Sequence, residues 1–254
     1  MLKQYRETVY ENALRRRNGA GAAPPPFSPI DITGLKLWLD GADSSTITGT
    51  TSVTQWRDKS GTGYVATPSG TAANVNTLNS NKIVDLGGYV TVPSFNWRTR
   101  FTTFFIAKYS SAMLYTQYNG GYIQYLFTAN GNLYNIDSSA FSVTDSATGG
   151  SITGNDWYIL CMGYSGGTTA VPYSLNGTTR TTTVGGIASD KIITQPLTFS
   201  GRPDSSFAGS VAEILHYNEP LTTPQVQKVE GYLAWKWGLQ ANLPAGHPYK
   251  SGAP

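Results

Sequence analysis

The chain has 254 residues, of which 13% are charged and 12% are aromatic, and 28 of them are glycines. This length suits one large domain or two small ones, and the composition favours strands joined by tight turns over long solvated helices. No run of about 18 apolar residues occurs, so no membrane-spanning helix is predicted. The single cysteine, Cys161, excludes an intrachain disulfide, and its apolar neighbours predict a buried strand thiol.

The positive charge is concentrated in the first 30 residues, which hold five basic and two acidic side chains, whereas the remainder is neutral. We predict a basic arm with a proline-rich linker over 1–30, and a body with no specific affinity for nucleic acid. Apolar spacing predicts a short amphipathic helix over 1–17, and Pro24–Pro26 predict an extended spacer. The candidate partner-binding residues of the arm are Leu2, Tyr5, Arg6, Val9, Arg15, Arg16 and Arg17.

From residue 31 onward the sequence alternates in the manner of short strands. Asn-Gly pairs at 119–120, 130–131 and 176–177 supply the positive φ values of type I′ turns and predict hairpins. Many strands without intervening helical periods predict an all-β sandwich of antiparallel sheets over 31–254. The candidate strands are 35–39, 53–57, 83–86, 89–92, 101–108, 122–128, 157–164, 171–175, 180–184 and 206–217.

One helix is predicted in the body, over 222–238. Thr222 and Gln225 have the spacing of a capping box, with a proline in the first turn, and Gly238 is suited to a left-handed end. Apolar residues recur every three or four positions between them. We expect Leu233, Trp235 and Trp237 to seal this helix onto the sandwich.

Four motifs resemble a known family. The segment 34–43 (GLKLWLDGAD), followed by 53–61 (VTQWRDKSG), resembles the opening of laminin-G-like domains of the concanavalin-A-like superfamily. The segment 207–217 (FAGSVAEILHY) resembles the final core strand of that family. The ending 229–239 (VEGYLAWKWGL), with 247–249 (HPY), resembles a subgroup frequent in large DNA viruses, phages and environmental bacteria. The resemblance implies a concanavalin-A-like jelly roll but no single function, because lectins, adhesins, glycosidases, lyases and capsid components share that fold.

Catalytic chemistry is poorly represented in this sequence. Glycoside hydrolysis needs two neighbouring carboxylates, but the five glutamates are not spaced as such a pair, and Glu213 is alone on its strand. We expect Glu213 to pair with a neighbouring loop. His216 is interpreted as part of a strand-end pair with Tyr217, and His247 lies in a proline-flanked tail. The sequence therefore predicts a protein that is not an enzyme, and we assign no residue a catalytic role.

Asp40, Asp43 and Asp58 follow strands and are close enough in sequence to converge on a calcium ion. The alternative interpretation is a turn at Asp40-Gly41 that Asp43 caps. No cysteine–histidine cluster suits zinc, so calcium is the one cofactor under consideration.

A glycan site is predicted where tyrosines and amides gather around two hairpins. Sugars stack on aromatic rings and hydrogen-bond to amides, although tyrosine is also common on sheet surfaces. The candidate residues are Tyr115, Tyr118, Tyr122, Asn119 and Gln124.

The favoured function is that of a non-enzymatic virion component, a minor capsid or capsid-associated protein made in the host cytoplasm and anchored to other capsid proteins by its arm. The first alternative is a lectin-like attachment or adhesion module at a cell surface or outside the cell, for which a signal peptide would be expected. The second alternative, a polysaccharide-degrading enzyme, lacks its carboxylates.

Overall fold

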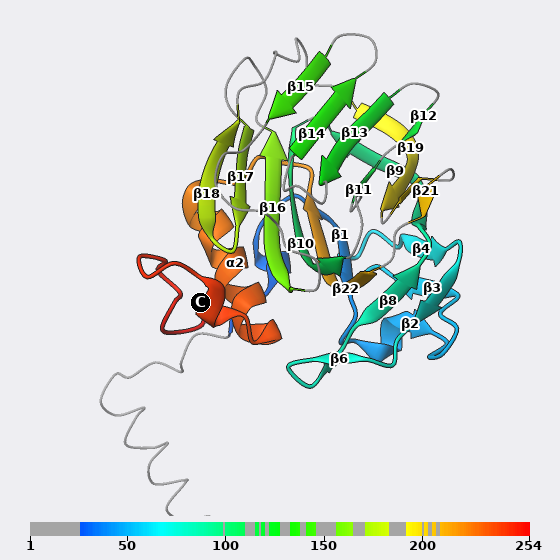
Figure 1. Ribbon diagram of the computed structural model, residues 1–254, viewed down its shortest axis with the longest axis horizontal. Helices are drawn as coiled ribbons and strands as arrows, with labels where there is room; N and C mark the ends of the chain where they lie inside the picture. The colour runs from blue at the N-terminus through cyan, green and yellow to red at the C-terminus, as the bar shows by residue number, and fades with distance from the viewer. Residues whose placement is uncertain are drawn as a thin grey trace, which may run out of the picture.

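The structure is a computed structural model, which describes residues 26–98, 100–109, 115–116, 118–119, 122–127, 133–137, 141–145, 156–164, 171–182, 192–199, 201–202, 205–206 and 209–254. These residues form an antiparallel β-sandwich with a single α-helix near the C-terminus, which confirms the predicted fold class (Figure 1). The first 25 residues, and with them all seven candidate residues of the arm, lie outside the described part. No helix in the described part is long and apolar enough to cross a membrane.

The larger sheet has eight strands. Seven of them follow the order β18-β17-β16-β10-β22-β8-β5, and β1 pairs with β22. One edge of β22 pairs with β10. Its other edge pairs with β8 at the start of β22 and with β1 further along. These strands are β1 (Leu35–Asp40), β5 (Thr71–Ala73), β8 (Val84–Gly87), β10 (Phe101–Tyr109), β16 (Tyr158–Tyr164), β17 (Val171–Leu175), β18 (Thr178–Thr182) and β22 (Gly209–Tyr217).

The second sheet has six strands in the order β11-β19-β9-β4-β3-β2. They are β2 (Ile47–Thr48), β3 (Gln55–Arg57), β4 (Val65–Pro68), β9 (Val90–Arg98), β11 (Tyr115–Thr116) and β19 (Ile192–Phe199). A four-stranded sheet joins β12 (Tyr118–Asn119), β13 (Tyr122–Phe127), β14 (Leu133–Asp137) and β15 (Phe141–Asp145). Two ribbons pair β6 (Thr77–Leu78) with β7 (Asn81–Lys82), and β20 (Gly201–Arg202) with β21 (Ser205–Ser206). Three 3-10 helices complete the set: η1 (Pro29–Asp31), η2 (Ser44–Thr46) and η3 (Gln240–Asn242).

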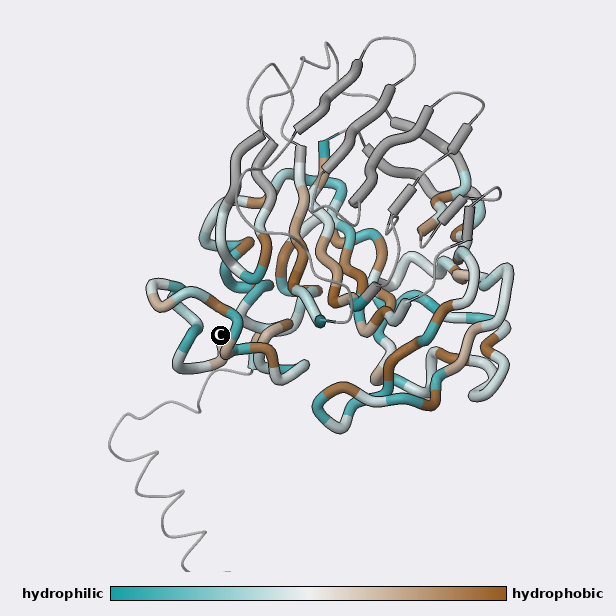
Figure 2. The backbone as a smooth tube through the Cα atoms, in the orientation of Figure 1, coloured by the Kyte–Doolittle hydropathy of each residue, from teal (hydrophilic) through white to brown (hydrophobic). Residues whose placement is uncertain are grey.

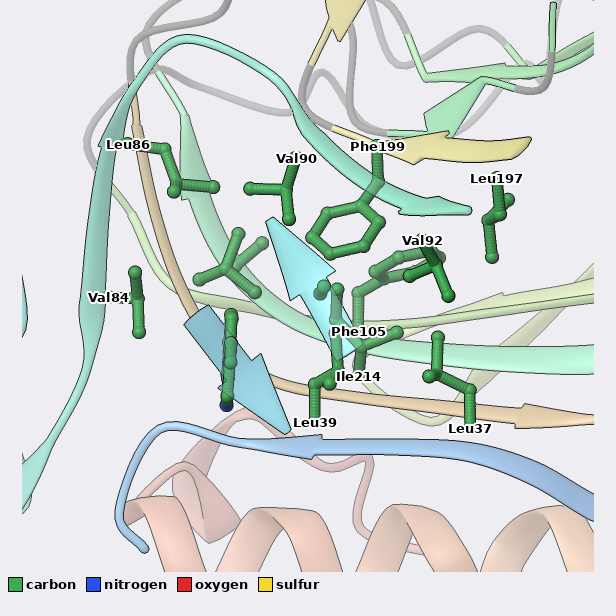
Figure 3. Packing of buried hydrophobic residues seen from close by; sticks show 14 of the residues in the cluster. Leu37, Leu39, Val84, Leu86, Val90, Val92, Phe105, Leu197, Phe199 and Ile214 are labelled. Carbon is green, nitrogen blue, oxygen red and sulfur yellow. The ribbon is translucent and has the colours of Figure 1, made fainter. Parts of the chain in front are cut away.

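Alternation along the strands divides the buried side chains between two cores. An intersheet core lies between the two larger sheets and includes Leu37, Leu39, Val84, Val90, Phe105, Leu160, Met162, Phe199 and Ile214, several of which are labelled in Figure 3. A helix-side core lies on the other face of the larger sheet and includes Leu35, Trp38, Phe104, Ile159, Cys161, Leu215, Val229, Leu233 and Trp237. Hydrophobic segments accordingly alternate with polar ones along the strands in Figure 2.

The helix α2 (Thr223–Trp237) forms as its sequence predicts. Thr222 and Gln225 make the capping box, a proline lies in the first turn, and Gly238 ends the helix with φ of 71°. Leu233 and Trp237 are fully buried in the helix-side core. Trp235 is half-buried, and its indole N–H donates to the main-chain carbonyl of Tyr249 at 2.8 Å.

The hairpin predicted at Asn176-Gly177 is also confirmed. Both residues have positive φ, 52° and 75°, and they join β17 to β18 with Leu175 opposite Thr178. Residue 178 therefore already belongs to β18, and the strand expected over 180–184 begins two residues earlier. Residues 120 and 128–132, which hold the turns of the other two Asn-Gly pairs, lie outside the described residues.

Other expected strand limits also differ from the observed ones. Residues 206 and 209 belong to separate strands, β21 and β22, and β3 begins at Gln55, two residues after the expected start. Several strands were not expected at all, including β4, β5, β14, β15 and β19. The chain that leads into β1 is also packed: Phe27 makes an edge contact with Tyr232 at 5.9 Å, and the Tyr217 hydroxyl donates to the carbonyl of Pro29.

We predict that Gly231→Ala destabilises the protein although alanine favours helices. A Cβ at position 231 would lie 2.6 Å from Cβ of Tyr249. The clash should outweigh the propensity gain and lower the free energy of unfolding by about 1–2 kcal/mol in denaturant titration. Gly246→Ala is the matched control, because a Cβ there meets no described atom within 4 Å. Equal stability of the two variants would contradict the tight contact between α2 and the tail.

His216 makes the stability depend on pH. Its ring is fully buried, stacks on Phe101 and contacts Thr103 Oγ1 through Nδ1 at 2.7 Å. Burial lowers the pKa of His216 from 6.5 to about 4. Between these values the unfolded chain binds the proton and the folded chain does not, so stability falls as the pH decreases.

We expect the wild type to lose about 3 kcal/mol more than His216→Gln on going from pH 6.5 to pH 4. Urea titrations of both proteins across this range measure the difference. Parallel pH profiles would show that His216 does not titrate as its burial requires.

Candidate functional site

The carboxylate of Glu213 is fully buried and lies at the centre of a network of hydrogen bonds and ion pairs. A β-bulge in β22 determines where it lies: Ile106 of β10 pairs with Glu213 and Ala107 pairs with Val211, so Ala212 is the extra residue. A bulge of this kind places two consecutive side chains on the same face. Val211 therefore remains in the intersheet core, while Ala212 and Glu213 both face the helix side.

Four donors surround this carboxylate, two for each oxygen. Oε1 accepts from Trp38 Nε1 of β1 at 2.7 Å and from the hydroxyl of Tyr232 at 2.9 Å. Oε2 accepts from Trp237 Nε1 at 2.7 Å and lies 2.8 Å from the ammonium of Lys236. Glu213 is 0% exposed, and a buried charge is tolerated when it is paired and fully hydrogen-bonded. The partners belong to β1 and α2, which corrects the expectation of a neighbouring loop.

The charge of Glu213 continues outward through a chain of ion pairs. Lys236 also lies 2.8 Å from Asp40, which in turn lies 2.8 Å from Lys59, and Lys59 lies 2.9 Å from Asp43. Burial raises the pKa of Glu213, although Lys236 opposes this effect. Burial disfavours the charge of Lys59, but hydrogen bonds to Asp40 and Asp43 outweigh it and raise the pKa of that ammonium. The Lys59 ammonium also lies 4.5 Å from the ring centre of Trp38.

The structure therefore brings Asp40 and Asp43 together, but around Lys59. Asp58 instead accepts from the main-chain N–H groups of Trp38 at 2.7 Å and Ser60 at 2.9 Å, which orders the loop after β3. Across the described residues, no group of three or more histidine, cysteine or acidic side chains is placed to hold a metal ion. Calcium binding stays a prediction from the sequence.

A second buried carboxylate, that of Glu230, fastens α2 to the tail. It accepts from the hydroxyl of Ser174 in β17 and contacts His247 Nε2 at 3.2 Å. His247 Nδ1 accepts from the main-chain N–H of Tyr249, so a neutral ring carries its proton on Nε2, facing Glu230. The sequence places His247 in a proline-flanked tail, and the structure buries it there. Burial and the nearby Glu230 also raise the pKa of Cys161, which confirms a buried thiol and disfavours its thiolate.

Of the predicted glycan site, the structure describes the backbone alone. Tyr115 in β11 pairs with Phe199 at the edge of the six-stranded sheet. Asn119 pairs with Tyr122 across the β12–β13 hairpin, and Tyr118 pairs with Ile123 in the adjacent row. Gln124 lies two residues further along β13. Four of the five candidates thus lie on one hairpin, and Tyr115 lies on a different sheet.

A pocket that the sequence did not predict lies where the β17–β18 turn meets the C-terminal tail. Its volume is about 440 Å³, and it is lined by Asp156, Trp157, Tyr158, Asn176, Leu239 and Asn242. These residues come from three segments that are far apart in the sequence. The sequence predicts the strand that begins near Trp157 and the turn at Asn176-Gly177, but it does not indicate that they line a common pocket.

We predict that Glu213→Gln destabilises the protein strongly. The amide nitrogen of glutamine would face two donors, Trp237 Nε1 and the Lys236 ammonium, and would leave them unsatisfied. The free energy of unfolding should fall by about 3–5 kcal/mol, as when one partner of a buried ion pair is removed. Glu219→Gln, which neutralises an exposed carboxylate, is the control in the same denaturant titration. A loss below about 1 kcal/mol for Glu213→Gln would mean that the network is not a major source of stability.

Comparison with known proteins supports the fold but gives no family. No protein-family model matches the chain, and no curated protein matches its sequence. Among solved structures, it is similar to domain 4 of AbnA, a GH43 extracellular arabinanase from Geobacillus stearothermophilus, solved with arabinotriose. The TM-score is 0.55 at 16% identity, over 76% of this chain and 96% of that one.

Two further likenesses cover a smaller share of the other protein. The binding domain of Paraclostridial Mosquitocidal Protein 1 matches with a TM-score of 0.56 at 12% identity, over 78% of this chain and 52% of that one. Trypanosoma rangeli sialidase in complex with sialic acid matches with a TM-score of 0.53 at 14% identity, over 92% of this chain and 39% of that one. This chain therefore spans only about two-fifths to one-half of those two proteins. At such identities the likeness shows a shared β-sandwich architecture.

Proposed function

We propose that this chain is a non-enzymatic, lectin-like module that binds glycans. The observation that carries the proposal is that the buried ionisable side chains make bonds that hold the fold together. Glu213 and Glu230 are buried and each is bonded to α2, to the tail or to a strand. Burial keeps His216 uncharged at neutral pH. An acid–base catalyst must reach its substrate, and these groups do not face solvent.

The fold neighbours agree with a binding role. Domain 4 of the arabinanase was solved with arabinotriose, and 96% of its length matches this chain. The matched botulinum neurotoxin C/D segment is a receptor binding domain, with a TM-score of 0.52 at 11% identity. Both neighbours are consistent with recognition of a glycan. We propose that this recognition takes place at a cell surface or outside the cell.

The virion role stays a prediction from the sequence. It depends on the basic arm, which lies outside the described residues, and on the subgroup resemblance. The comparisons support glycan binding better than a virion role, because one matched domain was solved with arabinotriose and another is a receptor binding domain.

Two measurements on the purified full chain test the proposal. On a glycan array, and then by calorimetry, we expect selective binding with a dissociation constant between about 1 µM and 1 mM. In reducing-end and unsaturated-product assays with β-glucans, alginate and chitin, we expect no cleavage, because the buried glutamates Glu213 and Glu230 are held in structural bonds. Reproducible cleavage by the wild-type protein, or an array without a selective signal, would contradict the proposal.

A further inference from the structure

The pocket beside Trp157 has rigid walls. On one side, Asn176 holds the turn of the β17–β18 hairpin to β16: its main-chain N–H donates to the Ile159 carbonyl at 2.8 Å, and its Oδ1 accepts from the Ile159 N–H at 2.9 Å. Gly177 packs against the tail, since a Cβ there would lie 2.9 Å from Leu243 Cδ2. The turn is thus fixed on both sides.

The tail that forms the opposite wall is tied by a lysine. The Lys250 ammonium donates to three main-chain carbonyls, those of Gln240 at 3.0 Å, Ala241 at 2.7 Å and Leu243 at 2.7 Å. These bonds fix the segment that carries Asn242. A pocket that is ordered before its ligand arrives avoids much of the entropic cost of binding.

The lining combines an aromatic ring with both kinds of hydrogen-bonding group. Trp157 is half-buried, packs against the helix-side core and lines the pocket. The Oδ1 of Asn176 accepts from the Ile159 N–H, and its Nδ2 donates to none of the described residues. Asn242, whose Nδ2 donates to the Trp157 carbonyl at 3.5 Å, offers its amide oxygen, and Asp156 also lines the pocket. An aromatic face with amides and a carboxylate around it suits a sugar ring, which has apolar faces and hydroxyls at its edge.

We propose that this pocket is a binding site for a neutral sugar residue, an inference that rests on the glycan-binding function proposed above. A volume of about 440 Å³ is near the lower end of the usual 300–1,000 Å³ range for ligand sites, which favours a short saccharide. Among the described lining residues, Asp156 is acidic and none is basic. An uncharged sugar therefore suits this lining better than a carboxylated one such as sialic acid.

The test uses the full chain with arabinotriose, xylotriose, maltotriose and cellotriose as neutral probes, with any neutral glycan selected by the array, and with sialyllactose as the acidic one. Asn176→Asp is the most specific variant, because aspartate tolerates positive φ and keeps the acceptor for Ile159 while it removes the donor. Trp157→Ala removes the aromatic face. Tyr122→Ala is the control at the predicted tyrosine site.

We expect at least one neutral probe to bind by calorimetry, sialyllactose not to bind, and both pocket variants to weaken binding by about tenfold or more. Tyr122→Ala should bind as the wild type does. If Trp157→Ala fails to fold by circular dichroism, Asn176→Asp decides alone.

The outcomes separate the two proposals. Wild-type binding that survives both pocket variants but is lost in Tyr122→Ala would overturn the pocket and leave glycan binding in place. Binding that survives all three variants would also overturn the pocket and leave glycan binding in place. A wild type that binds neither these probes nor any glycan on the array would overturn both.

Discussion

The carboxylate of Glu213 is buried between the larger sheet and α2, and the arrangement of the helix side follows from it. An isolated buried carboxylate would be very costly, so α2 must present Trp237, Lys236 and Tyr232 to it, and β1 must present Trp38. These four donors fix the position of the helix along the sheet. A purely apolar seam would tolerate small shifts of the helix, whereas this arrangement does not, because any shift would leave a charge or an indole N–H unsatisfied.

This network also explains why the terminal motifs of the sequence are recognisable. The opening segments 34–43 and 53–61 supply Trp38, Asp40 and Lys59, while 207–217 and 229–239 supply Glu213, Lys236 and Trp237. All of these residues meet in one set of contacts that holds the sandwich to its helix. The motifs therefore report an architecture rather than a chemistry, and so they predict the fold well and the ligand poorly. Most of the pocket proposed above, including Trp157 and Asn176, comes from segments that the motifs do not include.

Local signals made much of the fold predictable. Alternation located β1, β10, β16 and β17, and the capping box and Gly238 located α2. The strand β19 was missed because Pro196 interrupts its pattern, and the structure accommodates that proline beside a register shift between Gln195 and Leu197. The partners of Glu213 and the walls of the Trp157 pocket were out of reach for a different reason. They come from segments separated by up to 175 positions, and nothing in local spacing indicates which distant segments will meet.

The pairing of β1 with β22 has a consequence for biosynthesis. Trp38 leaves the ribosome 175 positions before Glu213, an interval on the order of ten to thirty-five seconds at ordinary rates of translation. Throughout that time β1 lacks the strand beside which it belongs, and its large apolar residues stay accessible to chaperones or to other nascent chains. The sandwich can close only once β22 has been made, and its folding is slowed by the long loop that must be closed first.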